Sequence, residues 1–443
     1  MKNIILIDRP CEHIDYVIQS KEYFIVVLIV ENIKQQEQYS KFDCIKHILT
    51  IEEMNKLDHV KKINYDLIEE FRPTQRKIEF AMHRFIIDGA QLSYIYYNAL
   101  SFWKEVFDNN KINFIISYTI EHGLVYDTLP LEMAVKNNIQ AYTISVSYTN
   151  CYWIYHLNTK EPLELIGNKF DYDTVKKNKC CSAVHNKNKE LSFKDKLINT
   201  NVMFAQFILM FLRGSTKQEV PGTGLEFDYF TKLKHYFVIG KMNRYYNKIS
   251  IEPDFTKKYV FYALHFEPEA VTNVTSQLQN QLTIIKMISD AIPRGWKIYV
   301  KEHPSQFKLN NLNFHYFILN LIYYKNLWFY KKLKSMSNVE LINLNAPSAE
   351  LIENSMVVAT INGTVGLESV LINKPLLHFE QNHTLLKLIK NLDQIRCYSD
   401  VKKYFKKFET NPPILYQGLE QLAKYTFNKD DSYLNIIYNS INK

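Results

Sequence analysis

Glycine is scarce in this chain, with 11 residues among 443. A glycine cluster therefore marks a place where the backbone has a special need, such as a close approach to a ligand. Cysteine is also scarce: the six residues show no CxxC pair and no metal-ligand spacing, and Cys180 directly precedes Cys181. Adjacent cysteines have poor geometry for a structural disulfide. We therefore expect no disulfide framework and no bound metal, and a reducing cytoplasm is the predicted compartment.

Long apolar runs are missing as well. The most apolar stretch, residues 202–212, has eleven residues, whereas a membrane-spanning helix needs about 20. It predicts a buried helix, with a helix that rests on a membrane surface as the alternative. Residues 4–7 form a short apolar strand pattern that lacks the basic start and the longer apolar core of a signal peptide.

The formal net charge is +8. A modest positive balance suits an anionic partner, such as nucleotide phosphates, an acidic glycan or a membrane surface, although it can also serve solubility alone. The basic residues are scattered, and no long basic tract points to nucleic acid. No nucleic-acid partner is therefore expected.

Strand and helix patterns alternate along the chain. In the first half, strands are predicted at residues 4–7, 23–30, 114–118 and 141–145, with helices over much of 63–99 and at 129–137. In the second half, strands at 259–264, 296–300, 339–342, 357–360 and 375–379 alternate with helices at 277–291, 348–354 and 367–371. Residues 160–250 read as less regular, with a break at 221–224. This alternation is typical of α/β domains with parallel sheets.

The predicted fold is therefore α/β, with two Rossmann-like domains. Residues 1–245 form an N-terminal domain on the acceptor side, 246–410 a donor domain, and 411–443 a helical segment that packs back on the N-terminal domain. Ligands of such sheets bind beyond the carboxyl ends of the strands, and two tandem α/β domains suit a ligand held in the cleft between them.

The sharpest motif is residues 359–369, a strand end followed by a glycine loop and a helix start. Free N–H groups at a helix N-terminus attract phosphate, and Gly363 and Gly366 would let the backbone approach it. Thr364 can donate a hydroxyl and cap the helix. Glu368 could accept hydrogen bonds from ribose or sugar hydroxyls. The alternative is a simple strand-to-helix turn, and the motif is neither a Walker loop nor a GxGxxG fingerprint.

Two further segments end strands of the same half. In residues 301–305, Lys301 supplies a positive charge and His303, followed by Pro304, can donate to a phosphate oxygen or stabilise a leaving nucleotide. In residues 264–270, Glu267 and Glu269 are candidate acceptors for sugar hydroxyls, and His265 lies at the same strand end. Exposed turns with incidental charge are the alternative for both segments.

The first half carries one polar loop, residues 121–127, after a predicted strand. Glu121 or Asp127 could remove the proton from an attacking hydroxyl, with His122 as a rival. A solvated loop carboxylate without a catalytic role is the alternative.

The order of these motifs, together with residues 338–342, 347–355 and 373–375, resembles the capsule polysaccharide biosynthesis family, which includes the capsular Kdo transferases. The resemblance covers about residues 255–385 and, in the first half, only 114–145. It implies a GT-B architecture with an interdomain cleft and a donor held by the C-terminal domain. The His-Pro element is similar to that of bacterial sialyltransferases and polyol-phosphate polymerases, which use CMP- or CDP-linked donors. His303 would then contact the donor phosphate. The matching donor-side residues are Pro304, Ser305, Asn362, Thr364 and Ser369.

The sequence thus predicts a metal-independent glycosyltransferase that moves a sugar from a nucleotide-sugar donor, with a CMP-sugar favoured, to a glycan or glycolipid acceptor in a bacterial surface polysaccharide such as capsule. A CDP-polyol-type phosphotransferase and a non-catalytic subunit are the alternatives. Two segments, the aromatic and basic stretch 323–334 and residues 202–212, suggest peripheral contact with the inner face of the cytoplasmic membrane. The alternative is that both segments are buried in a core or a domain interface.

Overall fold

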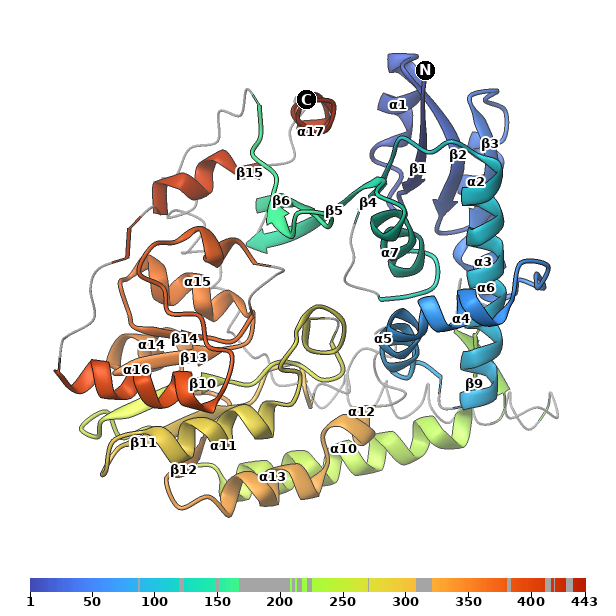
Figure 1. Ribbon diagram of the computed structural model, residues 1–443. Helices are drawn as coiled ribbons and strands as arrows, with labels where there is room; N and C mark the ends of the chain where they lie inside the picture. The colour runs from blue at the N-terminus through green and yellow to red at the C-terminus, as the bar shows by residue number, and fades with distance from the viewer. Residues whose placement is uncertain are drawn as a thin grey trace. The chain divides into compact units, whose positions relative to one another are not determined.

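The chain folds into two α/β units. Figure 1 shows the computed structural model, coloured from blue at the N-terminus to red at the C-terminus. The structure describes residues 1–86, 88–118, 123–148, 151–166, 208, 212, 217–220, 225–269, 271–307, 321–380, 384–410, 416–417, 419–427 and 433–443. One unit comprises Met1–Phe170, Glu219–Phe227 and Lys424–Lys443, and the other comprises Asp171–Gln218 and Asp228–Ala423. The predicted domain boundaries at 245 and 410 stay predictions.

The first unit is built on a mixed sheet of order β15-β6-β5-β4-β1-β2-β3, with β7 beside β6. The parallel strands are β1 (Lys2–Ile7), β2 (Tyr23–Val30), β3 (Ile45–Thr50), β4 (Phe114–Ser117) and β5 (Gln140–Tyr148). The antiparallel strands are β6 (Cys151–His156), β7 (Glu161–Pro162) and β15 (Thr426–Phe427). β2 reads YFIVVLIV and is almost wholly buried, as expected for a parallel strand covered on both faces.

Helices connect these strands. They are α1 (Ile14–Ser20), α2 (Ile33–Tyr39), α3 (Ile51–Asn55), α4 (Tyr65–Glu70), α5 (Arg72–Met82), α6 (Gly89–Asn109), α7 (Thr128–Lys136) and α17 (Tyr433–Ile441). Several begin at a side-chain cap, such as Asp88 before α6 and Asp127 before α7. Tyr438 of α17 is buried against Tyr23 of β2, so the end of the chain belongs to the core of this unit.

The second unit has a wholly parallel sheet of order β12-β11-β10-β13-β14. Its strands are β10 (Tyr259–Ala263), β11 (Lys297–Lys301), β12 (Val339–Ile342), β13 (Val357–Thr360) and β14 (Leu376–His378). Its helices are α10 (Tyr229–Ile249), α11 (Gln281–Ala291), α12 (Leu321–Tyr324), α13 (Leu327–Lys334), α14 (Ser348–Asn354), α15 (Thr364–Leu371) and α16 (Tyr398–Thr410).

Shorter elements complete the described part of the chain. They are a π-helix at Val271–Thr275, 3-10 helices at Leu385–Leu388 and Leu419–Lys424, and a two-stranded sheet of β8 (Lys217–Val220) and β9 (Leu225–Asp228).

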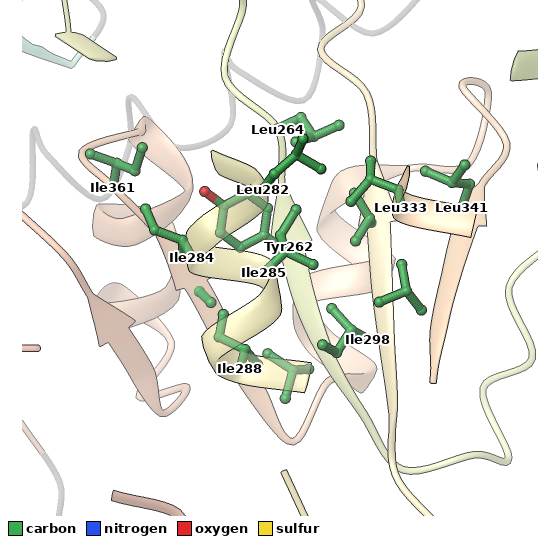
Figure 2. Packing of buried hydrophobic residues seen from close by; sticks show 14 of the residues in the cluster. Tyr262, Leu264, Leu282, Ile284, Ile285, Ile288, Ile298, Leu333, Leu341 and Ile361 are labelled. Atoms are coloured by element: carbon green, nitrogen blue, oxygen red, sulfur yellow. The ribbon is translucent and has the colours of Figure 1, made fainter. Parts of the chain in front are cut away.

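The core of the second unit is a layer of aliphatic side chains between α11 and the sheet. Figure 2 shows three isoleucines of α11, Ile284, Ile285 and Ile288, among side chains of neighbouring elements. Tyr262 of β10, Ile298 of β11 and Leu341 of β12 belong to the same cluster, and so does Leu333 of α13. Packing of this kind holds the sheet rigid, so the loops at its carboxyl edge are well positioned.

The α/β class agrees with the sequence prediction, and so does the parallel pairing of β1 to β5 in the first unit and of all five strands in the sheet of the second. The region predicted to be irregular nevertheless contains α10, a helix of 21 residues. Residues 221–224 and all of 202–212 except 208 and 212 lie outside the described part. No described helix is both long and apolar enough to cross a bilayer.

Candidate functional site

If the strands of each sheet are numbered in chain order, the first five lie in the order 3-2-1-4-5 in both sheets. Each sheet therefore has a point where the strand order reverses. In the second unit this point lies between β10 and β13, which are neighbours although β11 and β12 come between them in sequence. In open α/β sheets, the ligand usually binds beyond the carboxyl ends of the strands at such a point. The segments at 264–270 and 361–366 follow these two strands.

His265 and Gly363 meet at this switch point. A Cβ placed on Gly363 would lie 3.3 Å from His265 Cε1 and 3.1 Å from Thr360 Oγ1. His265 Nε2 is 3.3 Å from Thr360 Oγ1, and its Nδ1 is 3.9 Å from Glu269 Oε2. Glycine at position 363 therefore allows the loop after β13 to pass close to the imidazole.

Part of the N-terminus of α15 is exposed and could contact a ligand. Gly363 is the N-cap and provides no side-chain cap, and Thr364 is the first helical residue and is exposed. The capping role expected for Thr364 is therefore wrong, because it lies inside the helix. Its hydroxyl and the first N–H groups of the helix remain suited to an anion. Asn362 and Glu368 are half-buried and have partners in the structure.

Two other residues of this motif face inward. A Cβ on Gly366 would lie 3.1 Å from Leu386 Cδ1 and 3.1 Å from Thr360 Cγ2, so this glycine lets α15 pack closely. Ser369 is buried, and its hydroxyl donates to the Val365 carbonyl at 2.5 Å. The structure thus gives both residues interior contacts of their own.

Lys301 ends β11 as a buried ammonium group. Its side chain is enclosed, with 4% of the residue exposed, and Nζ donates to Ser348 Oγ at 2.9 Å. Among the described residues, no carboxylate forms an ion pair with it, and no nearby charge contributes to the shift in its pKa. Burial lowers its pKa to about 8. An ammonium group has three N–H donors, so Lys301 can still donate a hydrogen bond to an anion.

The next residue, Glu302, is held by a different set of groups. Its Oε1 accepts from Lys325 Nζ at 2.7 Å and its Oε2 from the Tyr330 hydroxyl at 2.7 Å. Both ends of the ion pair are fully buried. Lys325 Nζ also donates to the His265 carbonyl at 2.6 Å. This lysine therefore ties the loop after β10 to the loop after β11.

His303, Pro304 and Ser305 remain half-exposed at the end of the same strand. The Ser305 N–H donates to His303 Nδ1 at 3.2 Å. Because Nδ1 accepts this bond, the neutral imidazole carries its proton on Nε2. The ring lies beside Phe266, with centroids 5.9 Å apart. His303 thus has an Nε2–H that can serve as a hydrogen-bond donor to an anion.

Glu267 lies in the interior, where both of its oxygens are bonded. Gln281 Nε2 donates to Oε1 at 2.7 Å and the Thr272 hydroxyl donates to Oε2 at 3.0 Å. Gln306 bonds to the Glu267 backbone in both directions. Burial raises the pKa of this carboxyl, against the opposing charge of Lys325. Its contacts position the loop, whereas the sequence suggested a sugar acceptor.

His378, at the end of β14, was missed by sequence reasoning. It is fully buried, and neither ring nitrogen has a hydrogen-bond partner among the described residues. Burial, with a smaller contribution from the charge of His265, lowers its pKa to about 3. Its position at the end of a buried strand is the one signal that could have found it.

His378 predicts an acid-sensitive fold. In the unfolded chain its pKa is near 6.5, so acid favours the unfolded state once the pH falls below this value and until it nears the folded pKa. Between pH 7 and pH 5 this group should cost about 2 kcal/mol of stability. Urea unfolding of wild type and His378→Leu at both pH values should show the smaller pH dependence in the variant. Identical pH dependence would contradict this origin.

The switch point of the first unit lies between β1 and β4. Asp127 is fully buried there and caps α7, since its Oδ1 accepts from the backbone N–H groups of Leu124 and Thr128. Its Oδ2 has no hydrogen-bond partner among the described residues. Burial raises its pKa to about 7, against these hydrogen bonds and the charge of Arg9. Glu121 and His122 lie outside the described residues.

Asp8 is a second buried carboxyl at this point, and sequence reasoning missed it. It follows β1, and its Oδ2 accepts from the His13 backbone N–H at 2.6 Å. Burial raises its pKa to about 7. Across the described ranges, no group of three or more His, Cys, Asp or Glu residues is placed to hold a metal ion.

No protein-family model and no curated protein matches this sequence. Similar solved structures include a KpsC beta Kdo 2,7 transferase from Thermosulfurimonas dismutans, at 12% identity over 77% of this chain and 89% of that chain, with a TM-score of 0.33. UDP-GlcNAc 2-epimerase from Methanocaldococcus jannaschii is similar at 12% identity over all of both chains, with a TM-score of 0.28. Anabaena Alr3699/HepE, in complex with UDP-glucose, is 7% identical over 100% of this chain and 99% of that chain, with a TM-score of 0.32.

Kdo transferases and UDP-GlcNAc 2-epimerases are thus among the similar structures. The α/β fold is shown by this chain's own two sheets, one mixed and one wholly parallel.

Proposed function

We propose that this protein is a glycosyltransferase that takes a sugar from a nucleotide-activated donor, with a CMP-sugar favoured, and adds it to a growing surface polysaccharide such as capsule. One observation carries the proposal. The carboxyl edge of the second sheet gathers the Lys301 ammonium, the imidazoles of His265 and His303 and the N-terminus of α15. All of these groups can donate hydrogen bonds to anions, which suits a phosphate-bearing donor.

In the proposed reaction, an acceptor hydroxyl oxygen attacks the anomeric carbon of the donor sugar. The bond between that carbon and the phosphate oxygen breaks, and its electron pair leaves on the phosphate. Lys301, His303 and the N–H groups at the start of α15 stabilise this charge as it develops. The hydroxyl proton passes to a carboxylate base, for which we propose Asp127, because it lies at the point where the strand order of the first sheet reverses and its Oδ2 has no hydrogen-bond partner among the described residues.

The acceptor is proposed to be a glycan or a glycolipid, and the reaction is proposed to need no bound metal. Both points rest on the resemblance of residues 255–385 to the capsule family. The same resemblance favours CMP over other nucleotides. A gain of phosphate in the product mass would instead identify a CDP-polyol-type phosphotransferase on this scaffold.

A thermal-shift panel with CMP, CDP, UMP, UDP, GDP and ADP tests the proposal. A nucleotide at 100 times its dissociation constant should add about 2.7 kcal/mol of stability. A selective shift with CMP supports a CMP-sugar donor, and a selective shift with UDP or GDP keeps the glycosyltransferase but changes its donor. No shift with any nucleotide would favour a non-catalytic subunit.

Lys301→Met should weaken binding of the selected nucleotide by roughly ten- to a hundred-fold, because a hydrogen bond from a charged donor is lost. Wild-type affinity should also fall as the pH rises through about 8, where Lys301 loses its proton, and the variant should lack this dependence. Isothermal titration calorimetry measures both effects.

Lys297→Met is the matched control for this variant. Lys297 lies at the opposite end of the same strand, where it forms a 3.3 Å ion pair with Glu340. Its replacement should leave nucleotide affinity and its pH dependence unchanged. Equal losses in the two variants would argue that Lys301 acts through the stability of β11 and not through the phosphate.

A further inference from the structure

The outer face of α10 combines aromatic and basic side chains without any acidic residue. Residues at intervals of four, three, four, three and four positions share this face, as the helical repeat requires. They are Phe230, Lys234, Phe237, Lys241, Arg244 and Lys248, and all of them are exposed. Tyr229–Ile249 contains no Asp or Glu at all.

The opposite face of the same helix is in the core. His235, Ile239, Met242 and Tyr246 recur at matching intervals, and each is buried. The helix is thus anchored to the second unit by one face, and its outer face is presented on the surface. Because the buried face fixes the rotation of α10 about its axis, the same residues always lie on the outer face.

A second group of exposed side chains lies on the neighbouring helices. α12 and α13 pack against α10, and all three lie together in Figure 1. Tyr323 contacts His235 of α10, with ring centroids 6.0 Å apart. Trp328 is 64% exposed, and Lys331 and Lys332 are exposed on the same helix. Residues 321–335 also contain no Asp or Glu.

A surface of this composition is unusual for solvent alone. Phe237 is 69% exposed, and Phe230, Tyr323 and Trp328 are each about half exposed or more. Large aromatic rings are costly in water, but they are favoured at the boundary between lipid headgroups and acyl chains. Lysine and arginine around them are attracted to anionic headgroups at the same depth.

We propose that this surface, defined by Phe230, Lys234, Phe237, Lys241, Arg244, Lys248, Tyr323, Trp328, Lys331 and Lys332, docks the protein on an anionic lipid bilayer. The aromatic rings enter the headgroup boundary, and the cations contact the lipid phosphates. The sequence pattern had raised residues 323–334 for such contact, and the structure adds the whole outer face of α10. The inference stands on this surface and does not depend on the nucleotide site.

Vesicle flotation with the full chain and no nucleotide tests the proposal. Vesicles of phosphatidylcholine mixed with phosphatidylglycerol should bind the protein, and vesicles of phosphatidylcholine alone should bind it at least about ten-fold more weakly. Trp328 is also a reporter, because Trp103 and Trp153 are buried and Trp296 is half-buried. Its fluorescence emission should shift to the blue on binding, and the shift should be absent in Trp328→Phe.

The double variant Trp328→Ser/Lys331→Glu should weaken vesicle binding by about ten-fold or more, since it removes a ring and reverses a charge. Tyr65→Ser/Lys61→Glu carries the same types of change on exposed residues of the other unit and should bind as wild type does. Circular dichroism spectra and melting temperatures of both variants exclude unfolding as a cause. Equal binding by all three proteins would overturn the proposal. So would binding to an acidic polysaccharide without binding to anionic vesicles.

Discussion

Replacing Lys325 with methionine should lower the free energy of unfolding by about 3–5 kcal/mol, one of the largest effects of a single substitution in this chain. The ammonium group is fully buried and donates to Glu302, Gln306 and the His265 carbonyl. Without it, Glu302 becomes a buried carboxylate that lacks its counter-charge. Urea unfolding of wild type and variant at pH 7 measures the loss.

A double-mutant cycle shows whether the ion pair is the cause. Glu302→Gln in the Lys325→Met background removes the orphaned charge, so the double variant should be more stable than Lys325→Met alone. Lys334→Met, on the exposed side of α13, should change stability by less than about 0.5 kcal/mol. A Lys325→Met protein as stable as wild type would show that the buried pair contributes little.

The same substitution should impair the proposed donor site. Lys325 holds the carbonyl of His265, and Glu302 accepts from the backbone N–H of His303 at 2.7 Å. Both imidazoles therefore depend on one buried ion pair for their position. We expect nucleotide affinity to fall in Lys325→Met even at temperatures where the variant is folded.

Asp127→Asn should separate activity from stability. If Asp127 is the base, transfer activity should fall by about 10²- to 10⁴-fold. The fold should survive, because an asparagine oxygen can still cap α7. Sugar transfer from the donor that the nucleotide panel selects, measured at pH 7.5, gives the first effect. An unchanged rate would assign Asp127 to capping alone.

Stability should change in the opposite direction to activity. The folded pKa of Asp127 is about 7 against an ordinary value of 3.8, so the folded state keeps a proton that the unfolded state releases. Wild-type stability therefore falls as the pH rises from about 4 to about 7, by up to about 4 kcal/mol for this group. The asparagine variant cannot ionise and should melt higher than wild type at pH 8. Asp127→Ala also loses the helix cap, so its free energy of unfolding should be about 1 kcal/mol lower than that of Asp127→Asn.

Much of the second sheet could be predicted because its strands are short apolar runs between turn residues. The predicted ranges 339–342, 348–354 and 357–360 match β12, α14 and β13. The sequence did not predict α10, because its apolar residues do not recur with a clear helical period. Phe230 and Phe237 lie on its exposed face while His235 lies on the buried one, so the apolar stripe does not stand out in the sequence.

Strands that pair over long distances in sequence were also missed. β15 pairs with β6 through Phe427 and Tyr152, which are far apart in the chain. Only two residues long, β15 carries no periodic signal of its own. Such a strand exists because a neighbour offers it a hydrogen-bonding edge, which no local pattern can reveal.

The sequence by itself determined the two α/β units, the strand order along the chain and the loops at which polar residues gather. These follow from local runs of apolar side chains, which must be buried wherever they occur. Only the tertiary structure decided the roles of Lys301 and Glu302, two adjacent charged residues at one strand end. Lys301 donates to Ser348 and can still donate to an anion, whereas Glu302 is neutralised by Lys325 from the bend between α12 and α13. Burial of a charge depends on what the folded chain brings beside it, and that partner is set by three-dimensional packing.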